Sequence, residues 1–200
     1  ASLLGAPDIG QLGLAEMADH YARLCDTTPL PVLADADTGY GSPIGVGRTI
    51  RAYERAGVAA LFIEDQVAPK RCGHMEGKRV IPVTEMVAKI KAATDARVDG
   101  DLVIMARTDA RAIEGLDAAI ERAQIYREAG ADLIFVEAPL IGVGLDKLLI
   151  VTKAQGDGRH HGRAERRVLP QLGVEAPRRQ QPLDVARGPR RMPRVFQHVA

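Results

Sequence analysis

The sequence has few of the residues that are typical of small disulfide-stabilised proteins or of membrane proteins. It has no tryptophan and only two cysteines, Cys25 and Cys72, which lie far apart without Cys-x-x-Cys spacing. That spacing argues against a zinc knuckle or a disulfide framework. No apolar run reaches about eighteen residues, and no basic segment precedes an apolar stretch, so neither a membrane span nor a signal peptide is visible. We expect a cytoplasmic protein with no membrane partner, in which Cys25 is a buried core residue.

Net positive charge is confined to the end of the sequence. Residues 153–200 contain one lysine and ten arginines against four acids, a charge of +7 that leaves −6 for the rest. A basic segment can bind nucleic acid, but this one lacks interleaved aromatics and any recognisable RNA or DNA module, so we expect no nucleic-acid partner. With five prolines and no periodicity, residues 153–200 are interpreted as an aberrant or disordered Arg/Pro-rich tail.

Apolar runs and helical patterns alternate through the first 139 residues. We expect strands over 30–34, 58–63, 102–106 and 133–136, and helices over 46–56, 84–95 and 116–129. Gly57 should end the first of these helices, while Thr84 and Asp117 should cap the second and third. After about residue 139 the regularity fails, and 148–151 can be a strand or the end of a helix. Residues 1–152 are therefore assigned to one unit.

Strands that are apolar throughout and separated by single helices predict a parallel sheet with covered faces. No Gly-x-Gly-x-x-Gly turn opens any of the helices, which disfavours a doubly wound dinucleotide-binding sheet. Polar groups at four strand ends fit a barrel whose site is built from many loops. The predicted fold class is α/β, a (β/α)8 TIM-barrel type that is incomplete, with its first and last strands missing or aberrant.

Carboxylates follow the predicted strands. Asp35 and Asp37 follow the first, and Glu64, Asp65, Asp109 and Glu137 follow the others. A ring of carboxylates at one mouth of a barrel suits Mg²⁺ or Mn²⁺. Asp35 and Asp37 are the preferred ligands. The alternative for any single acid is that it caps a helix or pairs with an arginine.

Two further features carry chemistry. Arg107 ends a strand and can hold a substrate carboxylate, with an ion pair to Asp109 or Glu137 as the alternative. Cys72 lies in the basic run Lys70-Arg71-Cys72-Gly73-His74, where its thiol should ionise more easily and act as an acid, base or nucleophile. His74 can donate to substrate or tune Cys72, and the alternative is that it is a solvent-exposed loop histidine.

Five motifs together resemble the isocitrate lyase and phosphoenolpyruvate mutase superfamily. The resemblance is strongest to its 2-methylisocitrate lyase-like branch, which also includes proteins similar to carboxyvinyl-carboxyphosphonate phosphorylmutase. The motifs are Asp35-Ala36-Asp37-Thr38-Gly39-Tyr40-Gly41, Ile63-Glu64-Asp65-Gln66, Lys70-Arg71-Cys72-Gly73-His74, Met105-Ala106-Arg107-Thr108-Asp109 and Val136-Glu137-Ala138.

The resemblance implies a Mg²⁺-dependent carbon–carbon lyase that cleaves a 2-hydroxy or substituted-malate carboxylate into a 2-oxo acid and a carboxylate. It implies Mg²⁺ (or Mn²⁺) at Asp35 and Asp37, with Glu64 binding through water, and Cys72 as the acid–base thiol of a gating loop. The implied catalytic residues are Cys72, Glu64, Arg107, His74 and Lys70. The implied substrate-binding residues are Asp8, Cys72, Gly73, His74, Arg107 and Glu137. Intact members of the superfamily form homotetramers.

Several alternatives remain open from the sequence. A phosphonomutase or an oxaloacetate-cleaving enzyme of the same superfamily would use the same metal site. Outside enzymes, the chain can be an inactive truncated remnant or a binding protein that uses its basic tail. We expect the first strand to precede Ala1 and the last strands to be replaced, because residues 153–200 match none of the superfamily's later motifs.

Overall fold

The computed structural model describes residues 5–72, 75–137 and 147–151. The tail at 153–200 and the residues Gly73 and His74 lie outside the described residues. In chain order the elements are α1 (Leu14–Thr27), β1 (Leu33–Asp35), α2 (Pro43–Ala56), β2 (Ala60–Glu64), α3 (Val83–Ala96), β3 (Val103–Thr108), α4 (Arg111–Glu114), α5 (Leu116–Glu128), β4 (Leu133–Glu137) and β5 (Lys147–Val151).

The strands form one sheet in the order β1-β2-β3-β4-β5. The first four are parallel, with Glu64 opposite Arg107 in the β2–β3 register, and β5 pairs with β4 in the antiparallel direction. A doubly wound sheet reverses its strand order, whereas a (β/α) barrel adds each parallel strand beside the last. The described sheet is therefore an arc of the predicted barrel type, and the fold class is confirmed.

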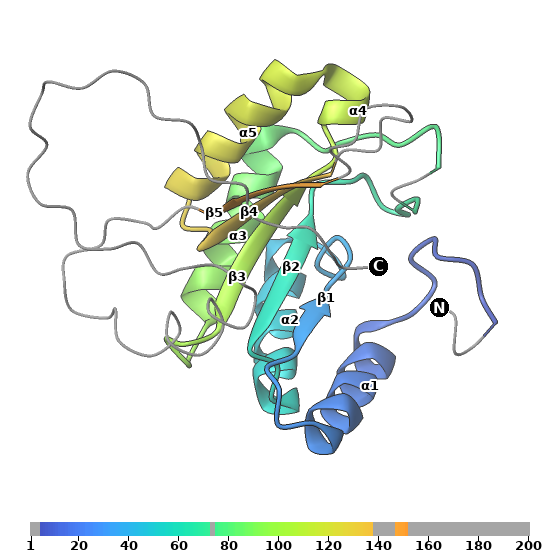
Figure 1. Ribbon diagram of the computed structural model, residues 1–200, viewed down its shortest axis with the longest axis vertical. Helices are drawn as coiled ribbons and strands as arrows, with labels where there is room; N and C mark the ends of the chain where they lie inside the picture. The colour runs from blue at the N-terminus through green and yellow to red at the C-terminus, as the bar shows by residue number, and fades with distance from the viewer. Residues whose placement is uncertain (1–4, 73–74, 138–146, 152–200) are drawn as a thin grey trace, which may run out of the picture.

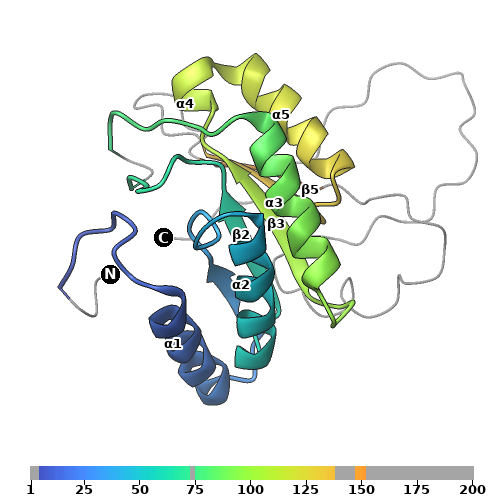
Figure 2. The same ribbon diagram turned by 180° about the vertical axis from the view of Figure 1, so that it is seen from behind.

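Helices α2, α3 and α5 cover one face of this sheet. They lie in front of the strands in Figure 2, whereas the strands lie in front in Figure 1. The helix α1 packs beside α2 and β1, below the rest of the helical layer in Figure 1. Neighbouring helices of the layer contact each other, α1 with α2, α2 with α3, and α3 with α5.

Alternation along the strands decides which side chains face which layer. One set forms the large core under the helices and includes Leu61, Ile63, Ile104 and Ile134. The opposite face carries a separate small cluster of Ala60, Val103, Met105 and Leu133, with Phe62 and Phe135 packed against it. Polar residues at the strand ends follow the same alternation, so neighbours in sequence face opposite sides.

The helix boundaries confirm some expectations and correct others. As expected, α2 ends at Gly57, which adopts the left-handed conformation that favours glycine (φ 85°). The predicted caps Thr84 and Asp117 are wrong, because the residues at those cap positions are Pro82 and Gly115. Pro82 presets an extended backbone ahead of α3 and so starts the helix earlier. Asp117 instead lies in the first turn of α5, where its charge favours the helix dipole.

Other sequence interpretations also change. The segment 148–151 is the strand β5 and not a helix end. Helices α1 and α4 were not predicted. Cys25 packs against the core beside Gly57, as expected, but it is half-buried, so the expectation that it is a buried residue is wrong. Within the described ranges, no helix is long and apolar enough to cross a membrane.

Candidate active site at the carboxyl ends of the strands

Asp35 is held by its backbone at the end of β1. Its N–H donates to the Tyr21 hydroxyl (2.8 Å), and its carbonyl accepts from the Tyr53 hydroxyl (3.0 Å). The hydroxyl oxygens of Tyr40 and Tyr53 lie 3.2 Å apart. These tyrosines come from α1, α2 and the loop between β1 and α2, so three elements fix the position of Asp35. Burial raises the pKa of the Asp35 carboxyl.

The loop after β1 turns sharply at Asp37. The Asp37 N–H donates to the Asp35 carboxylate (2.7 Å), and Asp37 itself has a positive φ of 47°, which aspartate tolerates better than most residues. Gly39 follows with a φ of 91°, and a Cβ there would lie only 2.6 Å from Val46 Cγ2. The Asp-x-Asp-x-Gly spacing is therefore what lets both carboxylates lie at the mouth.

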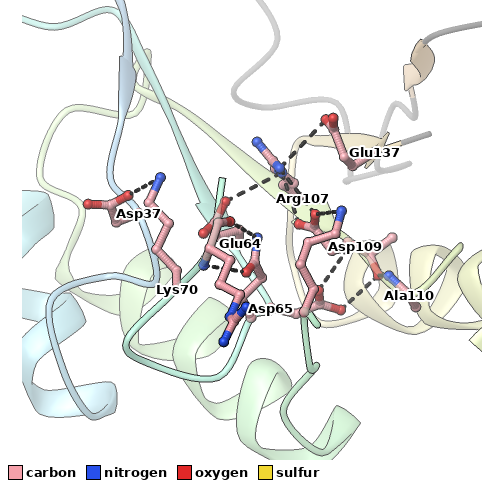
Figure 3. Close-up of polar contacts among 12 residues, drawn as sticks. Asp37, Glu64, Asp65, Lys70, Arg107, Asp109, Ala110 and Glu137 are labelled. Atoms are coloured by element: carbon pink, nitrogen blue, oxygen red, sulfur yellow. Dashed lines mark hydrogen bonds and ion pairs between the residues drawn. The ribbon is translucent and has the colours of Figure 1, made fainter. Parts of the chain in front are cut away.

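Lys70 binds two of the predicted site acids. Its ammonium lies 2.8 Å from the Asp37 carboxylate (Figure 3). It lies 2.6 Å from the Asp8 carboxylate, and the Lys70 side chain is 5% exposed. Burial lowers the pKa of Lys70, but the hydrogen bonds that its ammonium donates to Asp37 and Asp8 outweigh it, so the net shift is upward. Lys70 is therefore a fixed cation, better suited to binding an anion than to accepting a proton.

Arg107 lies at the centre of the carboxylates (Figure 3). Its Nε and Nη2 donate to the two carboxylate oxygens of Asp109, at 3.0 and 3.1 Å. Glu64 lies 3.5 Å and Glu137 3.7 Å from the same guanidinium. The ion-pair alternative for Arg107 is thus present in the structure, and it orients the group. The rings of Phe62 and Phe135 lie 6.0 and 5.6 Å from its central carbon.

Glu64 is the acid whose environment is most unusual. It is 1% exposed, and neither of its carboxylate oxygens has a hydrogen-bond partner. Burial raises its pKa to about 8, although Arg107 opposes the rise. A buried carboxylate without hydrogen bonds is costly unless another group compensates for it. A bound cation or a water molecule could supply the interactions that the two carboxylate oxygens of Glu64 lack.

Asp65 does not belong to the ring. Because strand side chains alternate, it faces the helices and accepts from Thr108 Oγ1 (2.7 Å), the Tyr126 hydroxyl (2.8 Å) and the Asp109 N–H (2.9 Å). Arg122 lies 3.4 Å away. The expectation that Asp65 lines the mouth is therefore wrong, and it is a buried structural carboxylate.

The segment after β2 carries Cys72 past the strand ends. Gln66 holds it by a reciprocal pair of hydrogen bonds with the Arg71 backbone, both 3.0 Å. The Cys72 side chain is half-buried, and its carbonyl accepts from the Met75 N–H. Sequence reasoning missed Lys78, which is buried and donates to Asp109 at 3.0 Å. The spacing of Lys78 from Cys72 gave no signal, since loops have no fixed period.

The donor set fits a hard divalent cation with few protein ligands. In the part of the chain that is described, no three acidic, histidine or cysteine side chains converge as a metal cluster. Magnesium commonly takes one or two carboxylates and keeps several waters. The oxygen donors of Asp35 and Asp37 match that chemistry, as do the Glu64 oxygens, which lack hydrogen bonds although Arg107 lies 3.5 Å away.

Curated relatives are similar over the same part of the chain. The chain is 54% identical over 139 residues to 2,3-dimethylmalate lyase of Eubacterium barkeri, covering 70% of this chain and 48% of that protein. It is 52% identical over 139 residues to 2-methylisocitrate lyase of Salmonella typhimurium, covering 69% and 47%. The chain thus spans about half the length of the curated relatives it matches.

Solved structures agree with the described fold. A crystal structure of 2,3-dimethylmalate lyase superposes with a TM-score of 0.66 at 44% identity, covering 68% of this chain and 46% of that one. Oxaloacetate acetylhydrolase in complex with 3,3-difluorooxalacetate gives 0.66 at 41% identity, covering 70% and 48%. Phosphonopyruvate hydrolase in complex with oxalate and Mg²⁺ gives 0.62 at 33% identity, covering 68% and 47%.

The family described as phosphoenolpyruvate phosphomutase matches residues 1–148, which is more than half of the chain. The 2,3-dimethylmalate lyase structure is described as a member of the PEP mutase/isocitrate lyase superfamily. The chain therefore belongs to the phosphoenolpyruvate phosphomutase family of the PEP mutase/isocitrate lyase superfamily.

Proposed function

We propose that this protein is a Mg²⁺-dependent carbon–carbon lyase that cleaves 2-methylisocitrate or a related substituted malate. The observation that carries the proposal is the cluster of Glu64, Arg107 and Glu137 at the strand ends, beside the Lys70–Asp37 pair. The names of the relatives, two of them carbon–carbon lyases for branched dicarboxylates or tricarboxylates, support the same reaction class.

The proposed substrate is anionic because cations line the site. Lys70 and Arg107 are both held in place by carboxylates and are largely buried, so their charge is weakly screened. Asp109 binds one edge of the Arg107 guanidinium, and the Nη2 atom also lies near Glu137. A substrate carboxylate bound beside Arg107 would replace part of the ion pairing between Arg107 and these acids. Glu137 would hold a substrate hydroxyl. The small carboxylate is the proposed partner of this site.

The proposed reaction is a retro-aldol cleavage. The hydroxyl of the substrate would pass its proton to the Glu137 carboxylate that holds it, its carbon becomes the 2-oxo carbon, and the broken carbon–carbon bond leaves its electron pair on the other fragment. Cys72 would donate a proton to that carbon and complete the second carboxylate product. Mg²⁺ or Mn²⁺ bound by Asp35 and Asp37, with Glu64 through water, would stabilise negative charge on the 2-oxo-acid half. A homo-oligomer is part of the same proposal.

Two other reactions use the same kind of site. The superposition with oxaloacetate acetylhydrolase and with phosphonopyruvate hydrolase keeps an oxaloacetate-cleaving and a phosphonate-cleaving enzyme as second candidates. Cleavage of a carbon–phosphorus bond does not require a thiol acid, so Cys72 favours the lyase. A panel of 2-methylisocitrate, 2,3-dimethylmalate, oxaloacetate and phosphonopyruvate separates these reactions by their products.

The first test is turnover of this panel by the purified chain. We expect release of a 2-oxo acid from 2-methylisocitrate or 2,3-dimethylmalate with Mg²⁺ present, and none after EDTA. Addition of Mg²⁺ in excess should restore the rate, because the metal is needed and not merely stabilising. Turnover that EDTA leaves unchanged, in a chain with a folded circular dichroism spectrum, would contradict the proposal.

The second test is the exchange of the proposed acid. Cys72→Ser should lower kcat by roughly a hundredfold or more while leaving Mg²⁺ affinity intact, because a hydroxyl is a much weaker acid than a thiol. Cys25→Ser is the matched control, since Cys25 lies on α1 and should tolerate the change. An active Cys72→Ser variant would remove Cys72 from the mechanism.

A further inference from the structure

The Asp109 carboxylate contacts two cations that belong to different parts of the site. Its Oδ1 accepts from Lys78 Nζ at 3.0 Å and from Arg107 Nη2 at 3.1 Å, and its Oδ2 accepts from Arg107 Nε at 3.0 Å. Lys78 belongs to the segment between β2 and α3 that also contains Cys72, whereas Arg107 belongs to β3. One carboxylate oxygen therefore joins this segment to the strand that carries Arg107.

The position of Asp109 is itself fixed by hydrogen bonds to the Asp65 carboxylate. Its N–H donates to the Asp65 carboxylate at 2.9 Å, and the adjacent Thr108 hydroxyl donates to the same carboxylate at 2.7 Å. Asp109 is fully buried, so its charge must be compensated, and Lys78 and Arg107 compensate it together. Removing either partner of such a buried charge pair is strongly destabilising, because the other charge is left buried without compensation.

The geometry points to Asp109 as a positioning residue that sets Arg107 and the Cys72-bearing segment in register through Lys78. The roles of Arg107 and Cys72 rest on the proposed function, but the link between them does not. Asp109 is not assigned to substrate or metal, because both of its oxygens already accept from these two side chains. Asp109 would then contribute to the reaction only by holding Arg107 and the segment of Lys78.

The link can be measured without any substrate. The probe is the rate at which iodoacetamide alkylates Cys72, read by peptide mass spectrometry, with Cys25 in the same digest as the internal reference. Lys78→Met and Asp109→Asn should each speed alkylation of Cys72 by roughly threefold or more and leave Cys25 unchanged, because the segment loses the ion pair between Lys78 and Asp109. In the double variant, Cys72 should be alkylated at nearly the same rate as in each single variant, since both changes break the same contact. Lys78→Arg, which keeps the cation, should restore most of the protection.

The results separate the possible outcomes. A Cys72 rate unchanged in Lys78→Met, or effects of the two changes that simply multiply, would overturn the proposal. If Asp109→Asn loosens the whole fold, Cys25 will accelerate as well, and Lys78→Met then decides alone. With an active enzyme, Asp109→Asn should lower kcat/KM by roughly tenfold to a hundredfold, because Arg107 is misplaced. If no substrate of the panel is turned over, the proposed function fails while the alkylation result still decides the link.

Discussion

Glu64 shows how a single side chain can report the state of this site. It faces the inner side of the sheet at the end of β2, is almost fully buried, and has no hydrogen-bond partner for either oxygen. Its pKa is raised to about 8 by burial, against the opposing effect of Arg107. Such a group is paired with a cation, or protonated, or it destabilises the fold.

The raised pKa of Glu64 predicts how stability depends on pH in metal-free buffer. Between the ordinary value of 4.5 and about 8, the folded chain keeps a proton that the unfolded chain has lost. The contribution of Glu64 to stability is therefore present below about 4.5 and is lost as the pH rises toward 8. We expect the Tm to fall less steeply across this range in Glu64→Gln than in the parent chain.

Thermal unfolding followed by circular dichroism at several pH values measures this difference. Glu128→Gln is the matched control, because Glu128 lies exposed at the end of α5. Its profile should follow that of the parent chain. Profiles that run parallel in all three proteins would show that Glu64 does not titrate in this range.

The polar junction between β2, β3 and α5 is held by Asp65. Its carboxylate accepts hydrogen bonds from Thr108, Tyr126 and the Asp109 backbone, and Arg122 of α5 lies at 3.4 Å. Burial raises the pKa of Asp65, while these hydrogen bonds oppose that rise. The junction fixes the ends of two strands against one helix, and it supports the mouth of the site from the helical side.

Asp65→Asn should therefore destabilise the fold strongly. Removing one partner leaves Arg122 with a buried charge that Glu114 alone compensates, and we expect the free energy of unfolding to fall by about 3 to 5 kcal/mol. Tyr126→Phe removes two hydrogen bonds, the one that the hydroxyl donates to Asp65 and the one that it accepts from Arg122, and should cost about 1 to 3 kcal/mol. Urea unfolding measures both. Asp117→Asn, an exposed change on α5, should stay within about 0.5 kcal/mol, and an Asp65→Asn variant as stable as this control would refute the junction.

The candidate metal ligands come from separate places along the chain that the fold joins. Asp35 ends β1, Asp37 lies on the loop after it, and Glu64 ends β2. The unfolded chain does not hold these three in one place, so a metal that binds them stabilises only the folded state. Binding should thus be visible in the stability of the entire chain, apart from any activity.

Mg²⁺ should raise the Tm of the parent chain relative to EDTA. At a concentration about a hundredfold above Kd, the stabilisation is about 2.7 kcal/mol, which corresponds to an increase of about 5 to 11 °C for a chain of this size. Asp37→Asn should lose most of the shift, since it removes a ligand charge. Differential scanning fluorimetry measures the shift, with Na⁺ at equal ionic strength as the control. An equal shift in the parent chain and Asp37→Asn would show that Mg²⁺ binds elsewhere.

Local patterns were sufficient to predict much of this protein. The apolar runs and helical spacings predicted four strands and three helices, and the Asp-x-Asp-x-Gly and Lys-Arg-Cys-Gly-His motifs indicated the superfamily. These features lie within short segments, where alternation, glycine conformation and strand ends determine the structure. Gly57 was correctly expected to end α2 for the same reason.

Contacts between distant segments could not be predicted in this way. Asp65 and Glu64 are neighbours in sequence, yet they face opposite layers, and only the register of β2 in the sheet decides which one faces the mouth. Lys78 donates a hydrogen bond to Asp109, which lies 31 positions further along the chain, and the Tyr21 hydroxyl of α1 accepts from the Asp35 N–H at the end of β1. Such pairings depend on how the helices pack on the sheet, because a sequence pattern sets the period of an element but not its partner.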